Sequence, residues 1–93
     1  MSLNLINEND YINNLHRKAL HYLNEKKFLK SEKIYLKIIK KNPNDDTALL
    51  NLGVIADKQN HLEKAISYYQ KTIRLKPEKY IAYFNIANIY KKQ

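Results

Sequence analysis

Apolar and small residues recur along most of the chain at intervals of three, four and seven positions. In the central segment they stand at Leu49, Leu52, Gly53 and Ala56, and again at Leu62, Ala65, Ile66, Tyr69, Thr72 and Ile73. This spacing puts each set on one face of an α-helix. The polar break at residues 58–61 is short, so the two helices are expected to fold back as an antiparallel pair. The same pattern predicts helices near residues 10–25, 28–41, 45–58, 62–75 and 79–92, with residues 1–9 as a frayed tail or a short leading turn.

The pattern repeats with a period of 34 residues. Pro43 and Pro77 are separated by this period, and each follows a helical run that a proline would end. The same shift places large residues on large ones and small on small, as in the sets Leu15/Leu49/Tyr83, Ala19/Gly53/Ala87 and Tyr22/Ala56/Tyr90. A fixed period of this length indicates stacked structural units. The predicted fold is therefore all-α, a solenoid of antiparallel helix pairs.

Two local features refine the central unit. Residues 44–46, Asn-Asp-Asp, can supply an N-cap oxygen and first-turn negative charge for the helix that follows. Gly53 falls in the middle of a helix, where glycine is less stable than alanine by roughly 0.5–1 kcal/mol. We therefore expect close approach of another backbone at Gly53, that of the second helix, with Ala65 and Tyr69 as the opposing wall.

These residues resemble the tetratricopeptide repeat family, whose 34-residue signature reads W-x2-L-G-x2-Y, then A-x3-F, then P. The central unit matches it as Leu49-x2-Leu52-Gly53-x2-Ala56, Ala65-x3-Tyr69 and Pro77. The resemblance implies one repeat at residues 12–45, a second at 46–79 and the first helix of an incomplete third at 80–93. Residues 1–11 would form an N-terminal tail or a short leading turn.

In this family the first helix of each repeat lines a concave groove that holds an extended or helical peptide. The resemblance thus implies a scaffold that binds a protein or peptide segment and is not an enzyme. By repeat position, the groove would be lined by Asn13, His16, Arg17, Leu20, Leu50, Asn51, Val54, Lys58, Ile81, Phe84, Asn85 and Asn88. Asn51 and Asn85 share one repeat position, where side-chain amides can hold a peptide backbone without reading its sequence.

The apolar groove residues have two interpretations. Leu50, Val54 and Phe84 can form a groove floor that suits an amphipathic or hydrophobic segment. The alternative is that some of them only pack between helices.

The charge balance suggests another class of partner. Lys and Arg number 17 against 9 Asp and Glu, a net charge of +8, and residues 24–41 carry seven of the lysines. Most of these lie off the apolar face, so RNA or an acidic partner could bind the outer surface. Only Arg17 and Arg74 are arginines, which argues against nucleic-acid recognition. A further alternative is the targeting module of a larger enzyme, such as a glycosyltransferase-like protein.

The residue types that usually carry catalysis or bind metal ions are either absent or at the wrong spacing. Cysteine is absent, and His16 and His21 do not have the spacing of a metal pair on one helix face. Neither catalysis, a cofactor nor a metal site is expected. No apolar run reaches the roughly 20 residues that a membrane-spanning helix needs. We therefore expect no membrane partner, and we expect a cytoplasmic location. The helix near 79–92 has apolar residues on more than one face, which predicts a longer array or self-association through that helix.

Overall fold

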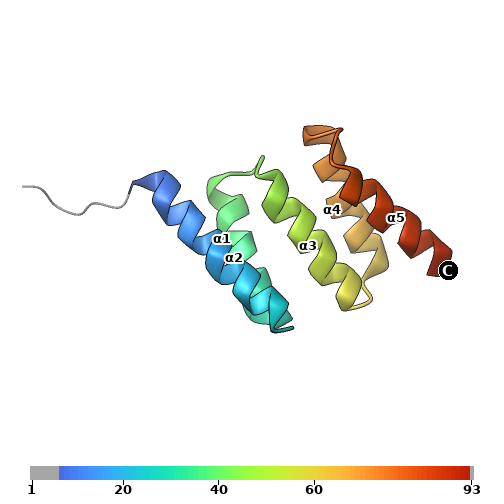
Figure 1. Cartoon of the computed structure of the whole chain (residues 1–93), viewed down its shortest axis with the longest axis horizontal. Coiled ribbons are helices and arrows are strands. Elements are labelled where there is room, and N and C mark those ends of the chain that lie inside the picture. Colours follow the sequence, from blue (N-terminus) through green and yellow to red (C-terminus); the bar gives the residue numbers. More distant parts are fainter. Residues whose placement is uncertain (1–6, 93) are drawn as a thin grey trace, which may run out of the picture.

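The computed structural model describes residues 7–92, which form five α-helices: α1 (Glu8–Asn24), α2 (Phe28–Lys41), α3 (Asp46–Lys58), α4 (Leu62–Leu75) and α5 (Tyr80–Lys92) (Figure 1). The all-α prediction is confirmed, and the helix bounds agree within two residues. The largest difference is at α1, which begins at Glu8 because Asn7 caps it: the Asn7 Oδ1 accepts a hydrogen bond from the Asp10 N–H at 2.8 Å. Residues 8 and 9 are therefore helical, and the expectation for residues 1–6 lies outside the described residues.

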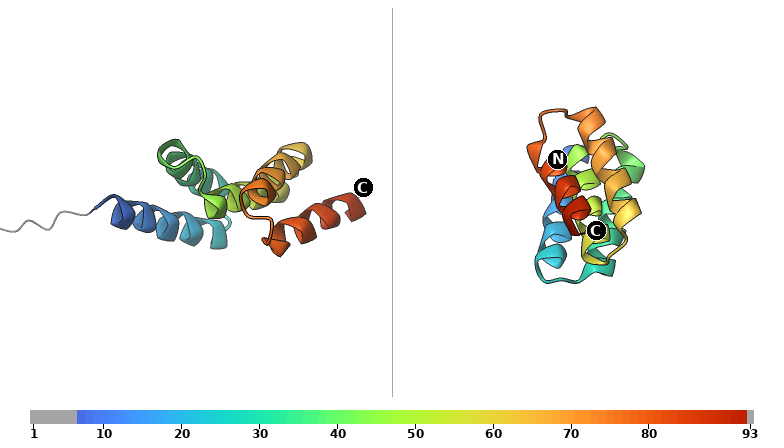
Figure 2. Two further views of the ribbon diagram at one scale, coloured as in Figure 1. Left: turned by 90° about the horizontal axis from the view of Figure 1, so that it is seen from above. Right: turned by 90° about the vertical axis from the view of Figure 1, so that its right-hand side faces the viewer.

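The helices alternate between two layers. α1 pairs with α2 and α3 with α4, while α2 packs on α3 and α4 packs on α5 (Figure 1). Seen from above, α1, α3 and α5 make up one layer and α2 and α4 the other, with α3 set slightly behind its two neighbours (Figure 2). The predicted antiparallel pairs are confirmed. The first helix of each unit thus contributes to one continuous face.

Short turns join the helices of each pair. Lys26 and Asn60 occupy equivalent places in the two turns and have φ angles of 60° and 65°. This left-handed conformation reverses the chain within a few residues, and Asn tolerates it better than Lys does. Between the units, Asp45 caps α3: its Oδ1 accepts a hydrogen bond from the Ala48 N–H at 3.0 Å. The cap predicted within residues 44–46 is confirmed at Asp45.

Gly53 lies against an aromatic ring. A Cβ atom at Gly53 would stand 2.5 Å from Cε1 and 2.7 Å from Cδ1 of Tyr69. The predicted close approach at Gly53 is confirmed with Tyr69 as its wall, but the space is filled by the Tyr69 ring and not by the backbone of the second helix. The ring is fully buried, in a core cluster that also contains Ala65 and Ala56.

The first unit closes in a different way. Ser31, at the repeat position of Ala65, is fully buried, and its hydroxyl donates a hydrogen bond to the Ala19 carbonyl at 2.7 Å. The buried hydroxyl is thereby satisfied, and it fixes α2 against α1.

One face of α5 is open. Tyr83, Ala87 and Tyr90 are exposed, although the equivalent residues of α3 (Leu49, Gly53 and Ala56) are buried. The covered face of α3 packs on α4, whereas α5 packs on the preceding helices through its opposite side, where Ala82 and Ile89 are buried. Within the described residues no helix covers the open face.

Candidate peptide-binding groove

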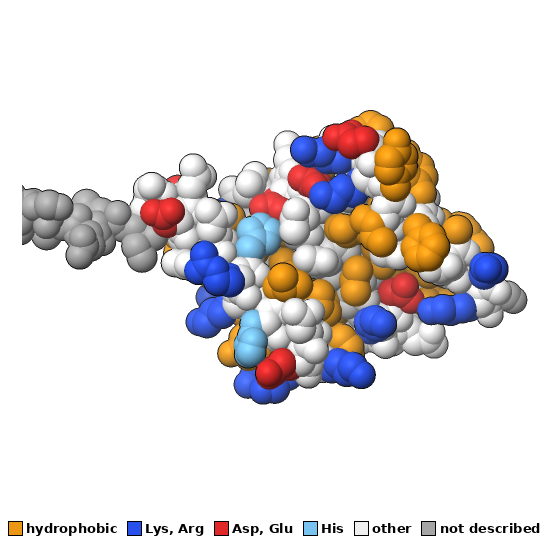
Figure 3. Space-filling view, in the orientation of Figure 1, with side chains coloured by type: hydrophobic (Ala, Val, Ile, Leu, Met, Phe, Trp, Pro, Cys, Tyr) orange, Lys and Arg blue, Asp and Glu red, His pale blue; other side chains and the backbone are white. Residues whose placement is uncertain are grey.

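The face made by α1, α3 and α5 contains two neighbouring hollows. The hollow between α1 and α3 has a volume of about 450 Å³ and is lined by Asn13, His16, Leu20, Tyr35, Asn42, Asn44, Asp45, Asp46, Thr47 and Asn51. The hollow between α3 and α5 has a volume of about 490 Å³ and is lined by Val54, Asp57, Lys58, Tyr69, Asn85, Asn88, Lys91 and Lys92. Figure 3 views this face, where apolar side chains cross the middle and basic side chains gather along the lower edge.

The α1 residues proposed for the groove differ in their surroundings. The His16 Nε2 hydrogen-bonds to Asp45 Oδ2 at 2.9 Å, so His16 ties α1 to the residue that caps α3. The Arg17 guanidinium donates to Asn14 Oδ1 at 2.8 Å and lines neither hollow. Leu20 lines the first hollow and is 47% exposed. Of the residues that line this hollow on α1, Leu20 thus offers exposed apolar surface to a ligand.

The Asn51 amide is already engaged by the protein. Its Nδ2 donates a hydrogen bond to the Tyr35 hydroxyl at 2.8 Å, which leaves the amide oxygen available to a peptide N–H. Burial raises the pKa of Tyr35, an effect that the Asn51 hydrogen bond opposes and the charge of Asp45 reinforces. Asn51 is thus part of the support of the groove as well as of its surface.

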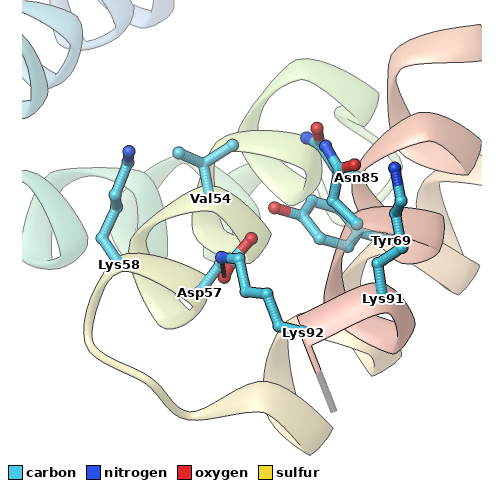
Figure 4. Close-up of a pocket in the computed structure, with 8 residues that line it drawn as sticks. Val54, Asp57, Lys58, Tyr69, Asn85, Lys91 and Lys92 are labelled. Atoms are coloured by element: carbon cyan, nitrogen blue, oxygen red, sulfur yellow. Dashed lines mark ion pairs between the residues drawn. The ribbon is translucent and has the colours of Figure 1, made fainter.

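In the next unit, Tyr69 and Asn85 are equivalent to Tyr35 and Asn51 but differ in their hydrogen bonding. The amide of Asn85 lies near the buried Tyr69 hydroxyl, yet that hydroxyl has no hydrogen-bond partner among the described residues (Figure 4). Burial raises the pKa of Tyr69 well above its usual value, the charge of Asp57 adds to the effect, and the nearby Asn85 amide opposes it. The group therefore stays a neutral hydroxyl that can donate.

Tyr35 and Tyr69 were absent from the sequence-based groove. The repeat signature assigns both to the core, where most of each ring does lie. One signal could have revealed them: each tyrosine precedes an asparagine by 16 positions, in the pairs 35/51 and 69/85. Such a recurring spacing between two polar groups in a helical repeat predicts a contact between them.

Of the apolar residues predicted for the groove, some pack between helices and others are open to a ligand. Leu50 and Val54 are half-buried and pack against the cluster around Ala82 and Ile89, so they serve the contact between helices. Val54 also lines the second hollow. By contrast Ile81 and Phe84 are 47% and 61% exposed.

Two ion pairs join α5 and the residue before it to α3. The Lys79 ammonium lies 2.9 Å from Asp46 Oδ2, and that of Lys92 lies 3.7 Å from Asp57 Oδ1. Burial acts to raise the pKa of Asp46, but the hydrogen bond and the positive charge of Lys79 outweigh it and hold this pKa below its usual value. Both pairs fix the third helix of the groove relative to the second.

Two kinds of feature are absent from residues 7–92. No helix in this part of the chain has the length and apolar character to cross a bilayer. No group of three His, Cys, Asp or Glu side chains there is arranged to hold a metal ion.

Residues 47–79 match the profile of the family described as "Tetratricopeptide repeat". The chain is also similar to the uncharacterized protein ycf37 of Cyanophora paradoxa, with 34% identity over 87 residues that cover 89% of this chain and 48% of the relative. It therefore spans about half the length of that relative. The helix pairs and the profile match agree, and residues 47–79 form a tetratricopeptide repeat within an all-α stack of helix pairs.

Proposed function

We propose that the face formed by α1, α3 and α5 binds a peptide segment of a protein partner. Tetratricopeptide repeats generally mediate protein–protein interaction. The observation that supports this use most directly is the set of exposed apolar side chains, Leu20, Ile81 and Phe84, on the helices of one layer. Leu20 stands on α1 and Phe84 on α5, the two outer helices of the face, and Asn51 stands on α3 between them. Asn85 follows Phe84 on α5.

The chemistry of the face suits an amphipathic segment. Apolar side chains of the segment would cover Leu20 and Phe84, which removes apolar area from water. The free oxygen of Asn51 would accept a hydrogen bond from the segment's backbone, and the exposed Asn13 and half-buried Asn88 offer further donors and acceptors. The exposed Arg17 belongs to this proposal as part of the rim, and the half-buried Leu50 and Val54 belong to it as part of the floor.

The test is peptide selection followed by substitution. A peptide library panned on the purified chain supplies the ligand, and Leu20→Ser and Phe84→Ser should each weaken its binding about tenfold or more, the effect of losing one buried large apolar side chain. Leu29→Ser and Leu36→Ser are matched controls, because both leucines are exposed on α2 in the opposite layer. Equal affinity of all four variants would refute the groove.

A second candidate is self-association through α5. The exposed set Tyr83, Ala87 and Tyr90 favours it, since a second copy could cover this face as α4 covers the same face of α3. Sedimentation over a concentration series should show a dimer that Tyr83→Lys abolishes. A monomer at the highest concentration would contradict this candidate.

The remaining alternatives can be separated from peptide binding. The outer basic surface includes Lys30, Lys33, Lys37 and Lys40, all exposed on α2. If RNA bound there, affinity would fall steeply with salt, and binding without that fall would exclude the role. A targeting module of a larger enzyme would use the same groove. The length of the full gene would distinguish it from a scaffold, because an enzyme would need a catalytic domain elsewhere in the chain. Cytoplasmic location stays a prediction.

A further inference from the structure

The first helix pair, at one end of the stack (Figure 1), contains a hollow with a basic rim. Its volume is about 440 Å³, and only residues of α1 and α2 line it: Lys18, Tyr22, Lys30, Lys33, Ile34 and Lys37. The four lysines are exposed, whereas Tyr22 and Ile34 are half-buried. The hollow therefore combines an apolar floor with four ammonium groups, and no carboxylate lines it.

The acidic residues nearest to these lysines in the sequence, Glu25 and Glu32, are paired elsewhere. The Glu25 Oε1 lies 3.4 Å from the Lys27 ammonium. Glu32 points to α4, where its Oε2 lies 3.6 Å from the Lys64 ammonium. Among the described residues, none of the four lysines of the hollow has an acidic partner within 4.0 Å. Their charges are therefore available to an anionic ligand.

The equivalent face of the second unit makes a different contact. Lys18 corresponds in the repeat to Leu52, which is 1% exposed and packs in the core cluster that includes residues of α2. Ile34 corresponds to Tyr68, which packs against the same cluster. The first unit thus covers this face of the second, whereas within residues 7–92 no helix covers it in the first. Because burial of a lysine without an acidic partner is costly, this face suits a polar ligand better than a further helix pair.

The hollow lies on a different side of α1 from the candidate groove. Lys18 comes two residues after His16 of the groove, and two residues turn an α-helix by about 200°. Tyr22 stands in the same relation to Leu20. A ligand in the hollow therefore leaves the groove free.

The Tyr22 ring bears on the class of ligand. The Lys30 Nζ stands 5.5 Å from the centroid of this ring, a cation–π contact that holds an ammonium group over the floor. A nucleic-acid base could stack on the ring only after it displaced Lys30, and none of the lining residues is an arginine. These features favour carboxylates over nucleic acid.

From the apolar floor and the unpaired lysines together, we propose that the hollow on α1 and α2 binds an acidic segment of a protein partner. One apolar side chain of the segment would cover Tyr22 and Ile34, which removes apolar area from water. Acidic side chains on both sides of it would accept charge-assisted hydrogen bonds from the lysines of the rim. The attraction between the two sets of charges would also speed the encounter. This surface is separate from the groove, so its ligand does not depend on the proposed function.

Synthetic peptides test the site without knowledge of the partner. The probe is fluorescein-labelled Asp-Glu-Asp-Phe-Glu-Asp-Glu with an amidated end. One analogue replaces its phenylalanine by alanine, and another replaces all its acidic residues by the corresponding amides. Each is titrated with the purified chain and followed by fluorescence anisotropy. A peptide of this size should bind with a Kd on the order of 100 µM, and Kd should rise with salt because the lysines are exposed.

We expect both changes to the peptide to weaken binding. The amide analogue should lose about tenfold or more in affinity because its charges are gone, and the alanine analogue about fivefold because less apolar area is buried on the floor. In the protein, Lys18→Gln with Lys33→Gln should raise Kd about five- to tenfold and reduce its dependence on salt. Both lysines are exposed, so the change leaves the core intact.

The matched control removes two positive charges at the other end of the stack. Lys58→Gln with Lys91→Gln alters exposed lysines that line the hollow between α3 and α5, and it should leave Kd unchanged. An equal loss in the two variants would mean attraction to net charge alone and would overturn the proposal. A loss confined to the control variant would place the peptide in the groove and would overturn it as well.

The peptide series and an RNA probe give the remaining outcomes. Equal affinity for the acidic peptide and its amide analogue, or for the phenylalanine and alanine peptides, would contradict the charged rim or the apolar floor. A short polyuridine RNA should bind more weakly than the acidic peptide. If it bound more tightly, and Lys18→Gln with Lys33→Gln weakened it, the hollow would be a nucleic-acid site instead.

Discussion

The contact between Gly53 and Tyr69 permits a prediction whose sign depends on the tertiary structure. Gly53→Ala would place a methyl carbon 2.5 Å from Cε1 and 2.7 Å from Cδ1 of Tyr69, where 3.4–4 Å is ordinary contact. The ring would have to move by about 1 Å, yet it is fully buried in a closely packed core. We expect this overpacking to cost about 1–3 kcal/mol. The better helix propensity of alanine returns roughly 0.5–1 kcal/mol, so the net effect is a loss of stability of about 1 kcal/mol.

The same repeat position occurs twice more in the chain and provides the controls. Ala19 is fully buried, so Ala19→Gly should lose helix propensity and the burial of one methyl group, together about 1.5 kcal/mol. Ala87 is exposed on the open face of α5, and Ala87→Gly should lose only roughly 0.5–1 kcal/mol of propensity. Alanine is therefore the more stable residue at two of the three positions and glycine at the third.

Urea unfolding followed by far-UV circular dichroism measures all three changes, with the midpoint compared at constant slope. Gly53→Leu should destabilise at least as much as Gly53→Ala, because a larger side chain meets the same ring. If Gly53→Ala raised the free energy of unfolding, helix propensity would outweigh the contact, and the reasoning about the Tyr69 ring would be wrong.

Two further predictions concern paired polar groups. Tyr35→Phe should cost about 0.5–1.5 kcal/mol because it removes the acceptor of the Asn51 amide, whereas Tyr69→Phe should be neutral or stabilising, since its hydroxyl has no partner; urea midpoints of the two variants should differ accordingly. Lys79→Met should cost about 0.2–1 kcal/mol at neutral pH, as it removes the partner of Asp46. The folded-state pKa of Asp46 is lowered, so the carboxylate's stabilising contribution is complete above its unfolded pKa of about 4 and is lost as the pH falls through the folded pKa. The difference between wild type and variant in unfolding free energy should therefore vanish below the folded pKa. A difference that persisted at pH values about two units lower would show that Lys79 acts through its aliphatic stem.

Much of the fold could be predicted because its determinants are local in the sequence. Apolar spacing of three and four residues places the helices, and Pro43 and Pro77 mark the ends of the repeat units. The period of 34 residues then implies that successive units pack in the same way, so the arrangement of one helix pair predicts that of the next. The start of α1 was missed by two residues, because a cap by Asn7 outweighs the weak apolar pattern before residue 10.

For the candidate groove, the sequence could predict which residues lie on one face but not which contacts their side chains make. Repeat register assigns a residue to the face of α1, α3 and α5, but it does not say what that side chain contacts. His16 was predicted as a groove residue and is held by Asp45, and Asn51 gives its donor to Tyr35. These contacts join residues 29 and 16 positions apart in the sequence, across different helices. No local pattern encodes them.

The sequence by itself thus determined the class of fold, the helix bounds to within two residues and the repeat, because helix periodicity and capping act over a few residues. The tertiary structure decided which of the repeated positions are equivalent in practice. Gly53 faces a ring where Ala87 faces solvent, and the Tyr69 hydroxyl lacks the partner that Tyr35 has. The physical reason is that burial and hydrogen bonding depend on neighbouring helices, and these differ at each step of the stack even where the sequence repeats.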